Sequence, residues 1–387
     1  MKIRLLESLT DVGVTEWDAI SGPNDPFSTH AFLSTLEASG SVGQGSGWHP
    51  LHVTVWDDGP DGTERLVGAL PLYAKEHSYG EYIFDWGWAD AAMRMGRPYY
   101  PKLVAMAPVT PATGRRMLLH PDAESDREEI VAAMLAGAFE IADQIEASSI
   151  HFLFVTQEER DLLLSLHPEL RPRLTMQFHW HNEGWTSFDA YLASFKRSAR
   201  RNVVKERRRV RESGLEVRML EGEALDDDAW QLIHRTYRDT ASRKYGRPYL
   251  TREFFKMAPE RLRDIALAAV AYRDDTPVAA TLNFERGTHL YGRYWGCLED
   301  HEMLHFELCY YQLIERAIAR GVTRFEAGAQ GSHKLKRGLM PARIHSVHWL
   351  RDKVLRDAVN DFLIREAGET EMHIAHLTER GPFKRPE

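Results

Sequence analysis

The stretch that decides the fold runs from Tyr291 to Gly338 and reads YGRYWGCLEDHEMLHFELCYYQLIERAIARGVTRFEAGAQGSHKLKRG. It places a strand, a polar loop, an amphipathic helix, a second strand and a lysine-rich turn close together. Strand, helix and strand in this order predict a parallel pair of strands joined by a crossover helix. Because ligand sites in α/β folds form at strand ends, we expect the functional site in this stretch.

Each element of the stretch has its own signal. Thr288 to Trp295 alternates aromatic and polar residues, which predicts a half-buried strand. From His305 to Arg320 apolar residues recur at helical spacing, and Gly321 is suited to end that helix. Val322 to Ala327 then predicts a buried strand. The strand ends in 328–331, where small residues let the backbone approach a ligand closely.

The first half of the chain repeats this plan. An apolar helix followed by a short buried strand occurs at 131–155 and again at 311–327. The repeated order of elements predicts two copies of one module. We therefore expect an α/β (α+β) protein with two tandem modules, each a mixed sheet flanked by helices. The expected modules are 1–173 and 174–372, with a basic helix at 188–212 and a tail at 373–387.

The composition indicates an ordinary globular protein. The chain has 387 residues, of which 43% are hydrophobic and 27% charged, and this excludes disordered and fibrous classes. The longest apolar run, Ile130 to Phe139, is too short to span a membrane, and Met1 to Arg4 leads into no signal-type apolar core. We therefore expect a cytoplasmic protein, with Cys297 and Cys309 as reduced core residues.

The charge is distributed unevenly. Net charge is −8, yet Lys196 to Arg211 holds nine basic residues and one Glu, a local +8, so the rest of the chain sums to −16. On a helix these cations lie opposite an apolar face, and at this spacing they repel one another. One interpretation is a solvated surface. The other is that Arg200, Arg201 and Lys205 bind an anion, either the phosphates of coenzyme A or tRNA or an anionic bilayer surface. The last case would make the protein peripheral at the inner face of the inner membrane. The local charge is not the signature of a DNA-binding protein.

A second group of candidate ligand contacts lies in the turn after the last strand. Gln330, His333, Lys334 and Lys336 converge there beside a buried strand, and Arg293 lies on the preceding strand. Glycines and cations in such a turn are suited to hold a phosphate or carboxylate. The alternative is a solvated loop.

The helix of the stretch carries candidate catalytic residues. Glu307 and Tyr311 are one helical turn apart, so both are expected to face a cleft, the Glu as general base for an amine and the Tyr as acid. His305 is the alternate base and Tyr294 the alternate acid. Backbone N–H groups at 294–296 are the expected oxyanion site. The alternative is that Glu307 only satisfies the helix dipole.

Other common chemistries find little support. The histidine pairs 179/181 and 345/348 lack carboxylate or cysteine partners, so no metal site is expected. No nucleophile-elbow, Walker or dinucleotide-binding motif occurs, which disfavours hydrolase and nucleotide-kinase readings.

Several strings resemble a known family. The duplicated strand–helix–strand order is similar to tandem GNAT acyltransferase folds. More narrowly, the strings at 99–103, 110–114, 291–296 and 325–331 resemble the FemAB-like group of peptidoglycan biosynthesis or recognition proteins. Arg197 to Gly214 resembles the basic helix before the second module of Fem-type peptidyltransferases. The turn Leu335 to Gly338 resembles their Phe-Lys turn, with Leu in place of Phe.

The resemblance implies an amide-forming N-acyltransferase with no permanently bound cofactor. Fem-type enzymes move an aminoacyl group from tRNA to a peptidoglycan amine, and other members are implicated as bacterial ceramide synthases, which acylate a sphingoid base from a fatty acyl thioester. The aromatic segment 82–88 suits an acyl chain, so we expect the second activity, with acyl-CoA or an acyl carrier protein thioester as co-substrate. Asp85 and Lys102 are then expected to contact substrate. A Fem-type transferase and a non-catalytic recognition module are the alternatives.

One departure from the GNAT pattern concerns the donor. The usual pyrophosphate loop would fall at 297–305, and this segment has no glycine. The donor phosphates are therefore expected at the basic helix or at the turn with Lys334 and Lys336.

Overall fold

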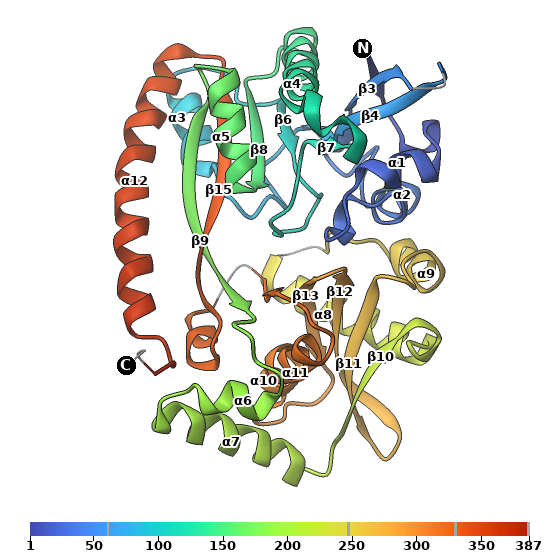
Figure 1. Cartoon of the computed structure of the whole chain (residues 1–387), viewed down its shortest axis with the longest axis vertical. Helices are drawn as coiled ribbons and strands as arrows, with labels where there is room; N and C mark the ends of the chain where they lie inside the picture. Colours follow the sequence, from blue (N-terminus) through green and yellow to red (C-terminus); the bar gives the residue numbers. More distant parts are fainter. Residues whose placement is uncertain (60–61, 246–247, 329–330, 385–387) are drawn as a thin grey trace. The chain divides into compact units, whose positions relative to one another are not determined.

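The computed structural model describes residues 1–59, 62–245, 248–328 and 331–384 (Figure 1). The chain divides into two units. The first contains Met1–Met176 and Arg343–Met372, and the second contains Gln177–Ala342 and His373–Glu387. No helix in the described ranges is both long and apolar enough to cross a membrane.

The first unit combines short strands with one long core helix. Its elements are β1 (Lys2–Leu6), α1 (Val14–Ile20), α2 (His30–Ala38), β2 (Trp48–Pro50), β3 (His52–Asp58), β4 (Glu64–Leu70), β5 (Leu72–Lys75), α3 (Trp86–Arg94), β6 (Lys102–Ala105), β7 (Leu118–Leu119), α4 (Arg127–Gln144), β8 (Ser149–Val155) and α5 (Gln157–Leu166). Three elements contribute residues to both units: β9 (Arg171–His181), β15 (Met340–Leu350) and α12 (Lys353–Glu379).

Two sets of strands organise this unit. β1, β3, β4 and β7 form one sheet in that order, and β2, β5, β6, β8 and β15 are neighbours in a second. β6 and β8 pair in parallel, and the chain between them includes α4. The expected helix-then-strand unit of the first half is therefore confirmed.

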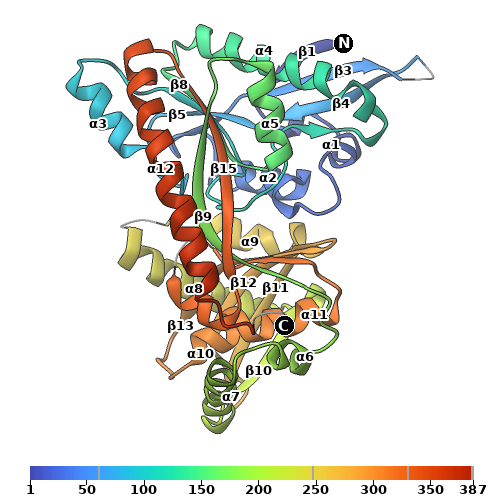
Figure 2. The ribbon, with the colours of Figure 1, turned by 60° about the vertical axis from the view of Figure 1, so that its left-hand side comes forward.

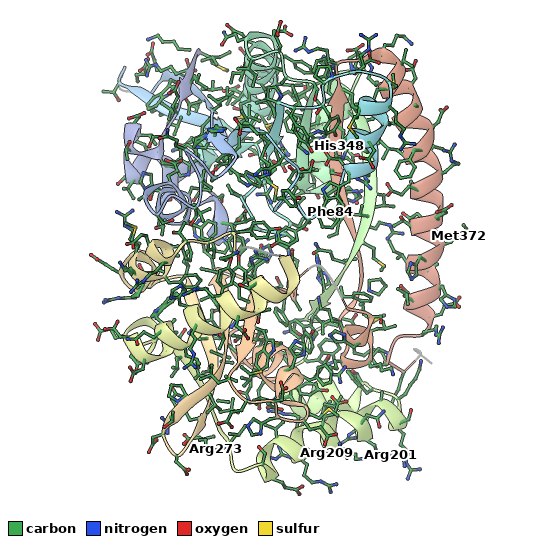
Figure 3. The ribbon with its side chains drawn as sticks, turned by 180° about the vertical axis from the view of Figure 1, so that it is seen from behind. Phe84, Arg201, Arg209, Arg273, His348 and Met372 are labelled. Atoms are coloured by element: carbon green, nitrogen blue, oxygen red, sulfur yellow. The ribbon has the colours of Figure 1, made fainter. Side chains whose placement is uncertain are left out.

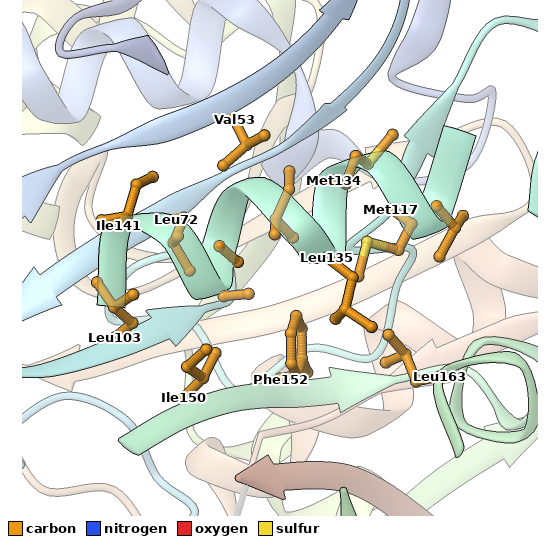
Figure 4. Packing of buried hydrophobic residues seen from close by; sticks show 14 of the residues in the cluster. Val53, Leu72, Leu103, Met117, Met134, Leu135, Ile141, Ile150, Phe152 and Leu163 are labelled. Atoms are coloured by element: carbon orange, nitrogen blue, oxygen red, sulfur yellow. The ribbon is translucent and has the colours of Figure 1, made fainter. Parts of the chain in front are cut away.

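The core of the first unit forms around α4 (Figure 4). Ile130, Met134 and Ile141 of this helix are buried with strand residues such as Val53 and Phe152. The helix lies close to β3, because a Cβ atom on Gly137 would come within 2.7 Å of a Val53 methyl group. Glycine is thus needed at 137 for this close packing of helix on sheet.

The second unit carries the stretch from which the fold was predicted. Its further elements are α6 (Phe188–Ala193), α7 (Arg197–Glu212), β10 (Glu216–Glu221), α8 (Asp227–Tyr245), α9 (Arg252–Arg261), β11 (Ala266–Arg273), β12 (Thr276–Arg286), β13 (His289–Cys297), α10 (Leu304–Phe306), a π-helical turn (Glu307–Tyr311), α11 (Gln312–Ala319), β14 (Arg324–Glu326) and a 3-10 helix (Ser332–Arg337). β10, β11, β12 and β13 pair antiparallel in sequence, β14 is parallel to β13, and β9 follows antiparallel. The predicted parallel pair with its crossover helix is confirmed.

The structure places one segment differently from the division expected from the sequence. Residues 343–372, which that division left in the second module, belong to the first unit. The reason is strand pairing: β15 lies antiparallel to β8, with His348 opposite His151. The boundary itself falls after Met176.

Candidate active site

The candidate site lies where β13 and β14 part. Their parallel pairing ends with Tyr291 opposite Glu326, and β13 then continues beyond the last pair. A bulge accompanies the parting: Gly292 and Tyr294 face consecutive residues of β12, which leaves Arg293 as the extra residue. Bulges bend a strand and are common beside active sites.

A buried lysine marks this point. Nζ of Lys334 donates a 2.6 Å hydrogen bond to the carbonyl oxygen of Gly328, which follows β14. Gly328 has φ +79°, and a Cβ atom on it would lie 3.7 Å from the carbonyl oxygen of Gly292 in β13. Lys334 is 2% exposed, and burial lowers its pKa to about 8. It therefore remains largely cationic at neutral pH.

His333, the residue before this lysine, belongs to a cluster of rings. The cluster consists of Trp295, His305, Phe306, Tyr310 and His333, which we call the histidine–tyrosine cluster. The Tyr310 hydroxyl and Nε2 of His333 are 2.9 Å apart. The His305 ring centroid is 5.3 Å from that of Trp295, 5.6 Å from that of Tyr310 and 5.9 Å from that of His333. Burial, together with the nearby charges of Arg337 and Lys334, lowers the pKa of His333, so its imidazole is neutral at pH 7.

The π-helical turn decides which side chains of the helix meet this cluster. Residues 307–311 adopt the wider π geometry, so the sequence no longer follows the α-helical period on which the expectation for Glu307 and Tyr311 rested. Tyr310, which the sequence analysis did not single out, is the residue that contacts His333. A π turn inside an α-helix is frequently found at functional sites.

Glu307 and Tyr311 instead contact α7. Glu307 is 5% exposed and accepts hydrogen bonds from Nε and Nη2 of Arg207 at 3.0–3.2 Å and from Gln312 at 2.8 Å. The Tyr311 hydroxyl donates to Glu206. These contacts tie the Glu307 carboxylate to α7, and its role as the base stays a prediction.

The same helix is tied to the turn that carries His333 and Lys334. Glu206 of α7 accepts hydrogen bonds of 2.9–3.1 Å from the Arg337 guanidinium, which also donates to the His333 carbonyl oxygen at 2.8 Å. The Arg337 guanidinium lies 3.3 Å from the centroid of the Phe306 ring. Arg337 thus links α7, the turn and the histidine–tyrosine cluster. The pairing of Arg337 with Glu206 was not predicted, since a charged pair 131 positions apart leaves no local signal in the sequence.

The other residues that the sequence predicted for the site lie in different surroundings. His305, His333 and Lys334 belong to the turn or to the cluster just described. Tyr294 packs against Tyr237 of α8, with ring centroids 4.7 Å apart, and the Arg293 guanidinium lies 5.0 Å from the Tyr294 ring. Lys336 is exposed. Gln330 lies outside the described residues.

Three cations on the outer face of α7 form no ion pair with described residues. Arg207 and Arg209 are paired with acidic residues, whereas Arg200, Arg201 and Lys205 are exposed and form no ion pair with any described residue. Together with Arg197, Val204 and Arg208, these three line a shallow groove of about 470 Å³. Figure 3 shows Arg201 and Arg209 on this helix. The predicted basic helix is therefore confirmed for 197–212, with a packed face and a cationic face, whereas the expected start at 188 was wrong, because 188–193 form the separate helix α6.

Asp85 and Lys102 are enclosed within the first unit. Lys102 is fully buried, and its Nζ donates to Ser78 at 2.9 Å, to Glu81 at 2.7 Å and to Asp85. Asp85 also accepts a 2.6 Å hydrogen bond from the Tyr99 hydroxyl. The contacts of both residues are those of a buried ionic network, which does not place them against substrate as expected. Such a network holds the loops that carry its members.

The described part of the chain contains no cluster of metal-binding side chains and no disulfide. There, no group of three or more His, Cys, Asp or Glu residues is arranged to hold a metal ion. Both cysteines are free thiols, and both are partly exposed rather than fully buried as expected.

The fold is of the α+β class, with mixed sheets flanked by helices, as the sequence predicted. The chain belongs to the FemAB-like family, described as peptidoglycan biosynthesis/recognition, whose model matches residues 8–385. No curated protein matches it.

Solved structures show the same fold. FemX has a TM-score of 0.56 at 13% identity, over 93% of this chain and 100% of FemX. The C-terminal domain of a putative lysylphosphatidylglycerol synthetase from Agrobacterium fabrum has a TM-score of 0.54 at 9% identity, over 91% of this chain and 95% of that one. A conserved protein of unknown function from Bacteroides thetaiotaomicron has a TM-score of 0.53 at 13% identity, over 90% and 100%. At these identities the likeness concerns the fold alone.

Proposed function

We propose that the protein is a Fem-type aminoacyltransferase that moves an aminoacyl group from a tRNA ester to the amine of a peptidoglycan precursor. Membership of the FemAB-like family supports this proposal. Neither the family nor the structures above carry a sphingoid base or a fatty acyl thioester in their descriptions, so the expected ceramide synthase activity has less support than this alternative.

The observation that carries the proposal is the buried ammonium of Lys334 at the parting of β13 and β14. Attack of an amine on an ester carbonyl forms a C–N bond and puts negative charge on the carbonyl oxygen. A cation held in a site of low dielectric stabilises that charge strongly and needs no reorganisation. With a pKa of about 8, Lys334 retains its proton at neutral pH and is suited to this role.

The step also requires proton transfer. The attacking nitrogen must lose a proton as the C–N bond forms, and the ribose oxygen must gain one as the C–O bond breaks. His333 is suited to accept the first proton, because its lowered pKa keeps the imidazole neutral at pH 7. The Tyr310 hydroxyl orients that imidazole through their 2.9 Å contact and can relay the proton toward the leaving oxygen.

The donor class follows from two features of the second unit. The segment 297–305 has no glycine with which to wrap a pyrophosphate, which disfavours coenzyme A. The outer face of α7 presents Arg200, Arg201 and Lys205 without ion pairs to described residues, an arrangement that suits phosphates of an RNA strand. Because Glu206 joins this helix to the turn with Lys334, RNA bound there would be held by the same rigid assembly as the catalytic groups.

The test is a comparison of donors with the purified full-length chain. One reaction contains a mixture of tRNAs charged with radiolabelled amino acids and a UDP-linked muramoyl pentapeptide, and the other contains palmitoyl-CoA with sphinganine. We expect the label to move to the pentapeptide in the first reaction and no N-palmitoyl sphinganine to form in the second. The Lys334→Met variant should not transfer the label. Formation of N-palmitoyl sphinganine instead would overturn the proposal in favour of the fatty acyl activity. Absence of both products, with pentapeptide binding retained, would favour a recognition module.

A further inference from the structure

Apolar side chains are unusually exposed around α3 in the first unit. Five residues make up what we call the α3 patch: Tyr79 (55% exposed), Phe84 (42%), Trp86 (50%), Met93 (70%) and Met95 (40%). Tyr79, Phe84 and Trp86 are three of the four aromatic residues that are exposed in the described part of the chain. Exposed apolar side chains gathered around one short helix indicate an interaction site.

The patch has a rigid base. Trp88 and Ala92, on the other face of α3, are buried in a small core with Leu355 and Val359 of α12. Phe84 and Trp86 stack with ring centroids 4.5 Å apart. The patch therefore lies on the outer face of a helix whose opposite face is packed against the first unit. Figure 2 shows α3 at the periphery of the first unit.

A pocket of about 800 Å³ opens within the patch. Tyr79, Trp86 and Met93 line it from the patch, and Tyr99 and Tyr100 line it from the segment before β6. The Tyr99 and Tyr100 hydroxyls are bonded to Asp85 and Ser78 at 2.6 and 2.8 Å, both partners of Lys102. The buried ionic network around Lys102 thus fixes two rings of the pocket. A pocket of this size, with mostly apolar walls, is within the range that binds small molecules or single chains.

Opposite charges lie on the same helix. Asp90 lines the pocket, and Arg94 lies one turn farther along α3. Both are exposed, and neither side chain forms an ion pair within the described ranges; the Arg94 guanidinium donates only to the Asp90 backbone carbonyl. An acid and a base one turn apart complement a headgroup that carries both a phosphate and an ammonium.

We propose that the α3 patch is a lipid-binding site with which the protein docks on a bilayer surface, one acyl chain entering the pocket while Asp90 and Arg94 meet a zwitterionic headgroup. Trp and Tyr rings at the edge of an apolar surface are typical of membrane–water interfaces. A protein partner is less suitable, because such an interface needs about 800 Å² of well-packed surface on each side, whereas the patch surrounds a hollow. The proposal does not depend on the transferase activity.

The experiment is flotation of the full-length chain with vesicles of phosphatidylethanolamine and phosphatidylcholine in 0.1 M and 0.5 M NaCl. Trp86→Ser and Met93→Ser test the patch. Met372→Ser is the matched control, since Met372 of α12 is 68% exposed in the same unit and is labelled in Figure 3. All three side chains are exposed, so circular dichroism and melting temperature should match the unchanged protein.

We expect the unchanged protein and Met372→Ser to bind equally, Met93→Ser several-fold more weakly and Trp86→Ser about tenfold more weakly. Binding should persist in 0.5 M NaCl because it rests on apolar contacts. Equal weakening in Met372→Ser, or no flotation with these vesicles, which contain no anionic lipid, would overturn the proposal. Binding of dodecylphosphocholine below its micellar concentration, without flotation, would also overturn it and indicate a pocket for detached amphiphiles. Transfer between soluble substrates should be unchanged in these variants, which separates this proposal from the proposed function.

Discussion

Replacing Lys334 with Met is expected to stabilise the folded protein at pH 7 while it abolishes transfer. Burial lowers the pKa of Lys334 from 10.5 to about 8. At about 1.4 kcal/mol per pH unit, keeping this ammonium inside the fold costs roughly 3 kcal/mol at neutral pH. The variant also leaves the Gly328 carbonyl without its donor, a loss of about 1 kcal/mol. The net expectation is a gain of about 2 kcal/mol in the free energy of unfolding.

The stability difference between Lys334→Met and the unchanged protein should depend on pH. The pKa of Lys334 is lower in the folded state than in the unfolded chain, so the penalty is fully present below pH 8 and vanishes above about pH 10.5. The stability advantage of Lys334→Met should therefore shrink between pH 8 and pH 10, as measured by guanidinium chloride unfolding. Lys336→Met is the control: that side chain is exposed and should change stability by less than about 0.5 kcal/mol. A Lys334→Met protein clearly less stable than the unchanged chain at pH 7 would refute the reasoning.

Three further predictions concern the ionic contacts. Glu307→Gln leaves Arg207 without its buried partner and should lower the free energy of unfolding by about 2–3 kcal/mol, seen in chemical denaturation, while the transfer rate per folded molecule changes less than about threefold; loss of transfer with unchanged stability would restore Glu307 as the base. Arg201→Ala with Lys205→Ala should weaken binding of charged tRNA and reduce the slope of log affinity against log salt by about 1.4–1.8, in filter-binding titrations; an unchanged slope would exclude this face of α7. Lys102→Met strands its buried carboxylates and should destabilise the protein by about 3–5 kcal/mol in thermal or chemical denaturation, whereas a neutral effect would mean that these carboxylates are protonated in the fold.

Local patterns predicted the elements that position the site. Alternation in β13, helical spacing after His305 and the apolar run before Gly328 are signals that depend only on neighbouring residues. The order of these elements predicted that β13 and β14 pair in parallel. The parallel pair in turn predicted that ligand-binding side chains lie at the ends of these strands. His305, His333 and Lys334 could be named for that reason, since strand ends and the turns after them are the parts of such a fold where backbone and side chains meet a ligand.

The rest required contacts between distant residues. Helical spacing placed Glu307 and Tyr311 toward a cleft, but the π-helical turn removed the regular period, and Tyr310 contacts His333 instead. Glu307 is bound by Arg207, a residue 100 positions earlier, and no local pattern reports such a pair. Likewise β15 lies within the second module expected from the sequence yet pairs with β8 of the first unit, because the tertiary fold decides which strands are neighbours in a sheet.

The central claim is that acyl transfer occurs at the parting of β13 and β14, with Lys334 acting on the transition state. The most direct measurement is single-turnover transfer from charged tRNA by the unchanged protein, Lys334→Met and Lys336→Met, with tRNA affinity measured separately for each. We predict a rate at least about a hundredfold lower for Lys334→Met, with affinity changed less than about threefold and Lys336→Met unaffected. An unchanged single-turnover rate in Lys334→Met would contradict the account and move the chemistry away from this lysine.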